Sequence, residues 1–278
     1  MSPEQYVQEK AAASGSSFYY AFLFLPPARR AAITAFYAFC REVDDVADEV
    51  TDPGVAATKL AWWRSEVGAA FSGRPSHPAM HALLPHAAAY AIEPSHLLAV
   101  IEGCQMDLDQ SRFLDYPGLE RYCHLVAGVV GEVAANIFGR TEASTLDYAH
   151  RLGLAMQLTN IIRDVGDDAR RGRIYLPMSE LKQFDVKTAD LLERRYSDRF
   201  TALMRFQAER AHRTYDDALA RLPEVDRATQ KPGLMMANIY RSLLREIEAD
   251  GFQVLHQRIS LTPVRKLWIA MRTNWRGR

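Results

Sequence analysis

The sequence has no charge bias, few cysteines and no long apolar run, and each absence excludes a class of protein. Its 34 basic and 34 acidic side chains cancel at pH 7, so we expect no nucleic-acid partner. Cys40, Cys104 and Cys123 form no C-x-x-C pair, which argues against zinc fingers and disulfide frameworks. No apolar stretch reaches the roughly 20 residues that span a membrane. The polar N-terminus carries no signal-peptide core, and we therefore expect a cytoplasmic protein.

Alternating β-branched runs are also missing, whereas stretches with the 3.6-residue period of a helix dominate the chain. Proline and glycine separate these stretches. Pro26-Pro27 is suited to begin a helix, and the T-D-P-G turn at 51–54 follows its end. There is no low-complexity linker and no repeat with a fixed period. The pattern predicts an all-α protein, with one domain over residues 1–278.

Residues 41–49 (REVDDVADE) crowd five acidic side chains behind an aromatic, apolar run. A helix turns about 100° per residue, so Asp44 and Asp48 share the apolar face, whereas Asp45 lies at its edge. Glu42 and Glu49 are interpreted as ordinary solvated residues. Burying a bare carboxylate is costly unless a cation compensates it. Taken alone, the run is also compatible with an exposed acidic helix end.

A second polar stripe lies between Gly153 and Pro177. Gln157, Asn160, Asp164 and Asp168 fall on one narrow line of the helical wheel, beside an apolar stripe. A solvated face normally carries Lys and Glu, whereas this one carries short oxygen-bearing side chains. Its two aspartates repeat the D-x-x-x-D spacing of the first motif, so the two helices can face one another across a shared site.

Paired carboxylates on facing helices can hold metal ions. Oxygen ligands alone favour Mg²⁺, with Mn²⁺ as an alternative, over zinc or copper. Mg²⁺ in proteins usually combines one or two carboxylates with waters and phosphate oxygens, which predicts a phosphorylated or diphosphorylated substrate. Arginine forks match phosphate oxygens, although each arginine could equally form a surface salt bridge. Those flanking the motifs are Arg41, Arg163, Arg170, Arg171 and Arg173.

The segments DDVAD and LTNIIRDVGDDARRGRIYLP resemble the two aspartate-rich motifs of the squalene and phytoene synthases, which join two isoprenyl diphosphates head to head. SGSSFYYAFLFLP, YCHLVAGVVGE and RISLTPVRKLW resemble further family segments, in the same order. The resemblance spans essentially the whole chain. Within the family, SGSSFYYAFLFLPPARR, REVDDVADE and ADGFQVLHQRISLTPVRKLW are most similar to the bacterial enzymes of hopanoid biosynthesis that make presqualene diphosphate.

The resemblance implies an all-helical isoprenoid synthase bundle with a central active-site cavity. It implies that Mg²⁺ is bound by Asp44 and Asp48 from one wall, and by Asn160, Asp164 and Asp168 from the other. The diphosphates would be held by Ser17, Tyr37, Arg41, Gln157, Arg163 and Arg173, with Asn160 beside them. Tyr240 would lie in a C-terminal helix that closes the pocket.

The implied reaction condenses two farnesyl diphosphates in an apolar tunnel and loses a proton as a cyclopropane closes. Where some relatives have an aromatic residue before Val-Ala-Gly, this chain has Leu125. Tyr122 and His124 are the nearby alternatives for handling the proton, and we expect His124 to be a packed core residue instead. The cavity could be lined by Phe18, Tyr19, Phe22 and Phe36, with plain core packing as the alternative for each.

The implied product, presqualene diphosphate, requires no NADPH, and squalene-forming enzymes would act downstream. Four alternatives stay open, and the first is a squalene or dehydrosqualene synthase, in which the reaction would continue beyond presqualene diphosphate. A phytoene synthase would use the same chemistry on geranylgeranyl diphosphate. A di-iron bundle would need two Glu-x-x-His pairs, but the second, at Glu93, contains Pro94. A non-catalytic relative would have lost its aspartate motifs, and both are intact here.

The C-terminus carries no acid from Arg258 onwards and interleaves basic residues with Trp268 and Trp275. A basic helix with tryptophans can lie on an anionic membrane surface, so peripheral membrane attachment is one expectation. Packing on the bundle is the alternative, as is a diphosphate-binding role for two of the basic residues. The basic residues are Arg258, Arg265, Lys266, Arg272, Arg276 and Arg278.

Overall fold

The computed structural model describes residues 1–13 and 17–276, and within these ranges it contains helices and no strand. Arg112 and Ile174 form an isolated parallel bridge. The helices are α1 (Pro3–Ala13), α2 (Phe18–Phe22), α3 (Pro27–Glu49), α4 (Pro53–Phe71), α5 (Pro78–Ala87), α6 (Pro94–Asp109), α7 (Tyr116–Cys123), the π-helix η1 (His124–Gly128), α8 (Val129–Phe138), α9 (Thr145–Arg170), α10 (Met178–Gln183), α11 (Thr188–Leu192), α12 (Asp198–Arg221), the 3-10 helix η2 (Glu224–Asp226), α13 (Lys231–Ala249) and α14 (Pro263–Arg276).

The helix boundaries follow the local signals in the sequence. α3 begins at Pro27, where the missing backbone N–H costs no helical hydrogen bond, and it ends at Glu49. The side chain of Asp52 then accepts a hydrogen bond from the N–H of Val55 at 2.9 Å and so caps α4. These ends fix which turn of α3 carries the first aspartate motif.

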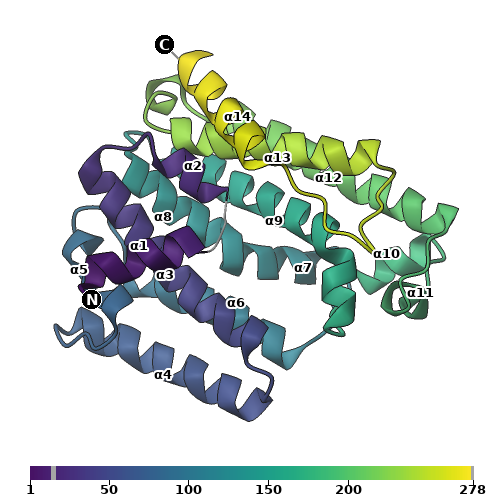
Figure 1. Cartoon of the computed structure of the whole chain (residues 1–278), viewed down its shortest axis with the longest axis horizontal. Helices are drawn as coiled ribbons and strands as arrows, with labels where there is room; N and C mark the ends of the chain where they lie inside the picture. The colour runs from purple at the N-terminus through teal and green to yellow at the C-terminus, as the bar shows by residue number, and fades with distance from the viewer. Residues whose placement is uncertain (14–16, 277–278) are drawn as a thin grey trace.

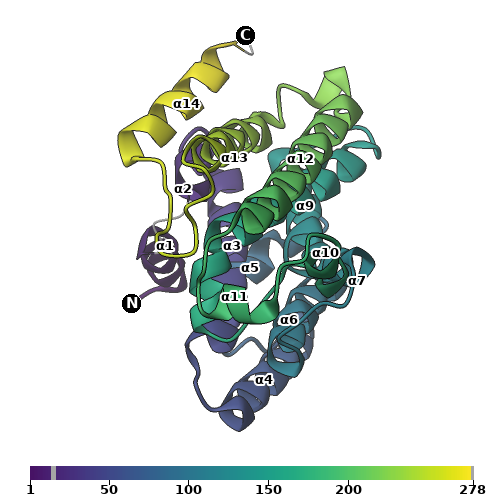
Figure 2. The same ribbon diagram turned by 90° about the vertical axis from the view of Figure 1, so that its right-hand side faces the viewer.

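The 26-residue helix α9 lies at the centre of the bundle (Figures 1 and 2) and packs against α8, α12 and α13. α3 packs against α1, α5 and α6 on the other side of the molecule. Glycine permits close approach of α9 to η1, since a Cβ at Gly153 would lie 2.2 Å from the carbonyl oxygen of Ala127. The two long helices α3 and α9 carry the two motifs.

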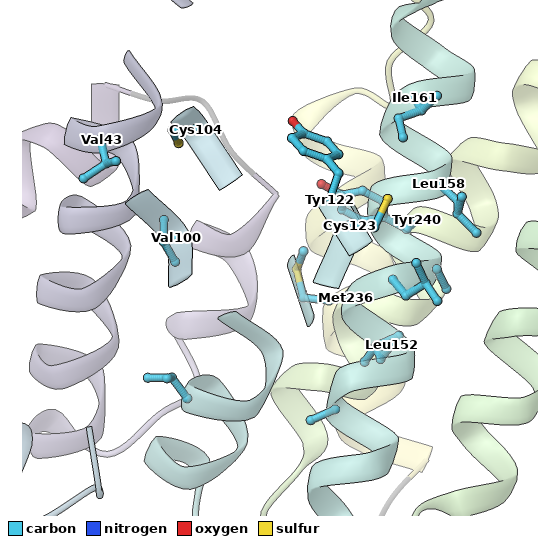
Figure 3. Packing of buried hydrophobic residues seen from close by; sticks show 14 of the residues in the cluster. Val43, Val100, Cys104, Tyr122, Cys123, Leu152, Leu158, Ile161, Met236 and Tyr240 are labelled. Carbon is cyan, nitrogen blue, oxygen red and sulfur yellow. The ribbon is translucent and has the colours of Figure 1, made fainter. Parts of the chain in front are cut away.

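The buried core joins the two halves of the bundle. Figure 3 shows Val43, Val100 and Cys104 on the side of α3 and α6. Leu158 and Ile161 of α9 lie on the opposite side, with side chains of α13 beside them. Apolar packing around both helices fixes the position of α3 relative to α9, and so positions the functional side chains that the two helices carry.

Among the described residues, no helix is both long enough and apolar enough to cross a membrane. α14 lies on the outside of the bundle against α13 and near α2, and its C-terminal end projects away from the other helices (Figure 2). This helix buries Ile269 and Ala270, half-buries Leu267, and leaves Val264, Trp268, Met271 and Trp275 exposed.

Candidate active site

The helices enclose a cavity of about 370 Å³. Its walls come from α3, η1, α8, α9 and α13, and the segment 258–266 lies over one end. One end is polar and the rest is lined mainly by apolar side chains such as Val126, Val130, Ala134 and Met156. Nine of the residues predicted to act in catalysis or to bind substrate or metal line it: Ser17, Tyr37, Arg41, Asp44, Tyr122, Gln157, Asn160, Arg163 and Tyr240.

The remaining predicted residues lie around the polar end instead of lining the main cavity. Arg173, in the segment that follows α9, donates from Nη1 to Oδ1 of Asp48 at 2.9 Å and from Nη2 to the carbonyl oxygen of Ala47 at 2.7 Å. Arg171 pairs with the same carboxylate at 3.0 Å. Arg173 and Asp168 also line a small neighbouring pocket. The second motif is therefore tied directly to the end of the first.

In the first motif, Nη1 of Arg41 donates to Oδ2 of Asp44 at 2.6 Å. The pKa of Asp44 is raised to about 7, mainly because burial disfavours the charged form and then because of the charge of Asp48, while Arg41 opposes the shift. Asp44 sits in the concave wall of the cavity, yet 43% of its side chain stays accessible to water. It is a carboxylate that an incoming ligand can reach.

Two neighbours of this motif differ in their outcome. Asp45, placed at the edge of the apolar face, is held by Arg41 and by Lys10 at 2.8 Å, away from the cavity lining. Glu42 was interpreted as solvated, which is wrong. It accepts a hydrogen bond from the hydroxyl of Tyr6, pairs with Lys10 at 2.9 Å, and is only 16% exposed. The packing of α1 on α3 buries it, and a wheel drawn for one helix cannot include that neighbour.

In the second motif, Asp164 is compensated and Asp168 is not. Burial alone would raise the pKa of Asp164, but hydrogen bonds from Arg163 and Arg258 lower it below its ordinary value. Arg258 donates from Nε at 2.8 Å. The pKa of Asp168 is raised to about 8, first by burial and then by the charges of Asp164 and Asp48. No cation among the described residues lies within ion-pair distance of Asp168.

This cluster of carboxyl groups fits a divalent cation, which would favour their ionised forms. Asp44 and Asp48 offer carboxylates from α3, and Asp164 and Asp168 offer them from α9, with Asn160 one turn earlier. In the described part of the chain no three of these carboxylates have oxygens within 4.8 Å of one another. They therefore suit hard ions that also take water and phosphate oxygens, and not an all-protein cage.

Tyr240 of α13 completes the polar end. Its hydroxyl faces Asn160 and Arg163, which brings α13 up to the second motif. Asn160 donates from Nδ2 to Oε1 of Gln157 at 3.2 Å. Burial raises the pKa of Tyr240, so its hydroxyl keeps its proton and can donate to a ligand oxygen.

Asp107 of α6 was missed in the sequence. Its Oδ2 accepts the hydroxyl of Tyr122 at 2.8 Å, and its Oδ1 accepts the hydroxyl of Tyr175 at 2.7 Å. Burial raises the pKa of Asp107 to about 6, and the two tyrosines oppose the rise. A signal was available, because Asp107 follows the buried Val100 and Cys104 at helical spacing and so shares their inward face.

The aromatic candidates divide. Phe18 lines the cavity, whereas Phe22 and Phe36 are buried core residues, 6% and 1% exposed, outside the lining. The side chain of Tyr19 lies outside the described residues.

His124 does not line the cavity and is not a packed core residue either. It lies on η1 with its ring 4.9 Å from that of His150.

Residues 11–265 match the family model for squalene/phytoene synthase. The chain belongs to this family. Its members are head-to-head isoprenyl diphosphate prenyltransferases that use a divalent metal ion. The chain is 34% identical over 265 residues to phytoene synthase 1 of Arabidopsis thaliana, covering 93% of this chain and 63% of that protein. It is 35% identical over 266 residues to the 15-cis-phytoene synthase of Synechococcus elongatus, covering 90% and 85%.

Solved structures agree with the fold. A dehydrosqualene synthase crystallised with a ligand superposes with a TM-score of 0.85 at 28% identity, covering 99% of this chain and 98% of that one. The squalene synthase HpnC from Alicyclobacillus acidocaldarius has a TM-score of 0.79 at 25% identity, covering 90% and 94%. The predicted all-α isoprenoid synthase fold is confirmed. The relatives divide between phytoene synthases and squalene or dehydrosqualene synthases, so they leave the presqualene diphosphate product a prediction.

Proposed function

We propose that this chain, as one domain over residues 1–278, joins two farnesyl diphosphates head to head, giving presqualene diphosphate and free diphosphate. The observation that carries the proposal is the meeting of two aspartate motifs at the polar end of an apolar cavity, with the charge of Asp168 uncompensated. A cation together with substrate diphosphate balances that charge. The apolar remainder of the cavity accepts the prenyl chains.

Mg²⁺, or Mn²⁺ in its place, supplies a Lewis acid that stabilises the departing diphosphate. The residues that would hold it are Asp44, Asp48, Asn160, Asp164 and Asp168. The guanidinium groups at this end donate to phosphate oxygens in geometries that an ammonium cannot reproduce. The diphosphate-binding set is Ser17, Tyr37, Arg41, Gln157, Arg163, Arg173 and Tyr240.

Departure of diphosphate from the donor leaves an allylic cation in the apolar part of the cavity, where the walls exclude water that would capture it. The double bond of the acceptor attacks this cation, and a proton leaves as the cyclopropane closes. The hydroxyl oxygen of Tyr122 is placed to accept that proton while its own proton passes to Asp107, 2.8 Å away. Tyr175 donates a second hydrogen bond to Asp107 at 2.7 Å and so helps to keep this pair in position.

The depth of the cavity supports farnesyl chains. Asn160 lies at the polar end and Tyr148 at the far end of the lining on the same helix, so their separation is twelve residues, or about 18 Å. Phe138 and Tyr148, both largely buried, stand at that far end. An extended farnesyl chain matches this depth, whereas a geranylgeranyl chain has one more isoprene unit to place.

Phytoene synthesis from geranylgeranyl diphosphate is the second candidate, because the chain is 33–36% identical to phytoene synthases. The deciding experiment incubates the enzyme and Mg²⁺ with each diphosphate separately, without NADPH, and identifies products by mass spectrometry. Presqualene diphosphate from the farnesyl substrate is the expected result. Product from geranylgeranyl diphosphate alone would replace our proposal with the second candidate.

We also propose that α14 attaches the enzyme to anionic membranes. Val264, Trp268, Met271 and Trp275 recur at helical spacing and are 78%, 53%, 45% and 80% exposed. An exposed apolar stripe on a helix that carries basic and no acidic residues is suited to lie in the headgroup region of a bilayer. α14 adjoins the cavity through its opposite face, where Lys266 lines the cavity. A very apolar product could then leave towards lipid.

Three other basic residues of the C-terminal region each contact a different side chain. Arg265 pairs with Glu246 at 2.6 Å, Arg258 pairs with Asp164, and Arg272 lies over the ring of Trp268. The side chain of Arg276 and all of Arg278 lie outside the described residues. In vesicle flotation, we expect binding to vesicles with anionic lipid and much weaker binding to neutral ones. Trp268→Ser with Trp275→Ser should abolish flotation, and unchanged flotation would refute the attachment.

A further inference from the structure

A cluster of metal-ligand side chains lies outside the cavity. His124 comes from η1, Glu132 from α8 and His150 from α9, and one donor atom from each lies within 4.8 Å of the others. None of the three lines the cavity, although Val126 and Ala127 of the same π-helix do. The cluster therefore sits on the opposite side of this wall from the prenyl-binding space.

The ligand atoms of this cluster are not all used in hydrogen bonds within the protein. Nδ1 of His150 lies 2.8 Å from Oε1 of Glu132. Nδ1 of His124 is buried and has no hydrogen-bond partner among the described residues. A buried imidazole nitrogen without a partner is costly unless something binds it.

The backbone leaves room for the two rings to meet. A Cβ at Gly128 would lie 2.9 Å from Cε1 of His150 and 3.3 Å from Nδ1 of His124, so a glycine is needed beneath the rings. The π-helix His124–Gly128 sets the register that brings His124 over this glycine. π-helical turns are rare and occur frequently at functional sites.

We propose that His124, Glu132 and His150 bind a transition-metal ion of the zinc class. Two imidazoles and one carboxylate are a ligand set that zinc accepts, with a water in the fourth position. Donor atoms around tetrahedral zinc are about 3.3 Å apart, so small side-chain rotations close the observed spread. The hard-oxygen aspartate site, in contrast, suits Mg²⁺. A bound ion would brace η1 and with it the part of the cavity wall formed by Val126 and Ala127.

The test uses the EDTA-treated full-length chain in excess Mg²⁺, titrated with Zn²⁺ in competition with a chromophoric chelator. We expect one zinc ion per chain. His124→Ala, His150→Ala and the nearly isosteric Glu132→Gln should each weaken zinc binding at least tenfold, with folding checked by circular dichroism. His86→Ala, a histidine on α5, is the matched control and should bind as the unmodified chain does.

Two further measurements separate this site from the active site. The double variant Asp164→Asn, Asp168→Asn should keep the zinc ion, whatever it does to turnover. Amide hydrogen exchange at residues 124–128 should slow at least threefold on zinc addition, and His150→Ala should remove that protection. Zinc binding that is absent, or that survives both histidine substitutions, would overturn the proposal and leave the proposed function untouched.

Discussion

Asp168→Asn should stabilise the metal-free protein while it removes activity. The pKa of Asp168 is raised from 3.8 to about 8. One pKa unit corresponds to about 1.4 kcal/mol, so ionised Asp168 costs at most ~6 kcal/mol of folding free energy. Water at the polar end screens much of this, and we expect about 2 kcal/mol of stabilisation by Asn at pH 8.5. For a chain of 278 residues, that raises Tm by roughly 3 °C.

The stability gained by Asp168→Asn should depend on pH in a definite direction. Between pH 5 and pH 8 the Asp168 carboxyl keeps its proton in the folded state but has lost it in the unfolded state. The free energy of unfolding therefore falls as the pH rises towards 8. The advantage of Asn should therefore shrink steadily from pH 8.5 to pH 5. Thermal unfolding in EDTA at these two pH values measures it. Mg²⁺ with diphosphate should reverse the order, because only the unmodified chain keeps the full ligand set.

The neighbouring Asp167 provides the matched control, since it is half-exposed and already has cationic partners in Arg170 and, at 3.9 Å, Arg258. Asp167→Asn should lower stability by less than about 1 kcal/mol at both pH values, as expected for a surface pair. If Asp168→Asn were no more stable than the unmodified chain at pH 8.5, the carboxylate would not be uncompensated. The electrostatic case for the cation site would then fail.

Three other substitutions or conditions give separate outcomes. Asp107→Asn leaves one tyrosine hydroxyl without an acceptor, so the free energy of unfolding should fall by about 1–3 kcal/mol, and kcat should fall with little change in KM. Asp109→Asn, on the exposed side of α6, is the control. An equal effect of the two substitutions would contradict the proton relay from Tyr122 to Asp107. Phe138→Ala should open the far end of the cavity at a stability cost of about 3 kcal/mol and raise product from geranylgeranyl diphosphate, measured by mass spectrometry. Calorimetry should show that Mg²⁺ binds at least tenfold more tightly when diphosphate is present, and independent binding would contradict this coupling.

Much of the site could be predicted from the sequence because its residues are local on two helices. The 3.6-residue period places Asp44 and Asp48 on one inward face, and Asp164 and Asp168 on another, whatever the rest of the chain does. Proline at the start of α3 and the T-D-P-G turn after it set that helix in the right place. Both signals depend on neighbours within a few turns.

What the sequence could not show depends on contacts between distant segments. Glu42 is buried by α1, and Asp107 is defined by tyrosines from α7 and from the segment after α9. Arg258 pairs with Asp164 across 94 positions. No periodicity within one helix encodes such partners. Phe22 and Phe36 likewise differ from Phe18 only in which neighbour covers them, so composition could not separate core from cavity lining.

The arginine–aspartate pairs explain why metal and diphosphate should bind together. In the free site, Arg41, Arg163 and Arg173 each hold a motif aspartate, so three of the four carboxylates are compensated by the groups that we assign to phosphate. Diphosphate alone would have to take arginines from carboxylates and leave those carboxylates unpaired. A divalent ion alone would meet only Asp168 without a partner, because the other three carboxylates are already paired. When both arrive, each arginine exchanges a carboxylate for phosphate and each carboxylate gains the cation, so no buried charge is left uncompensated.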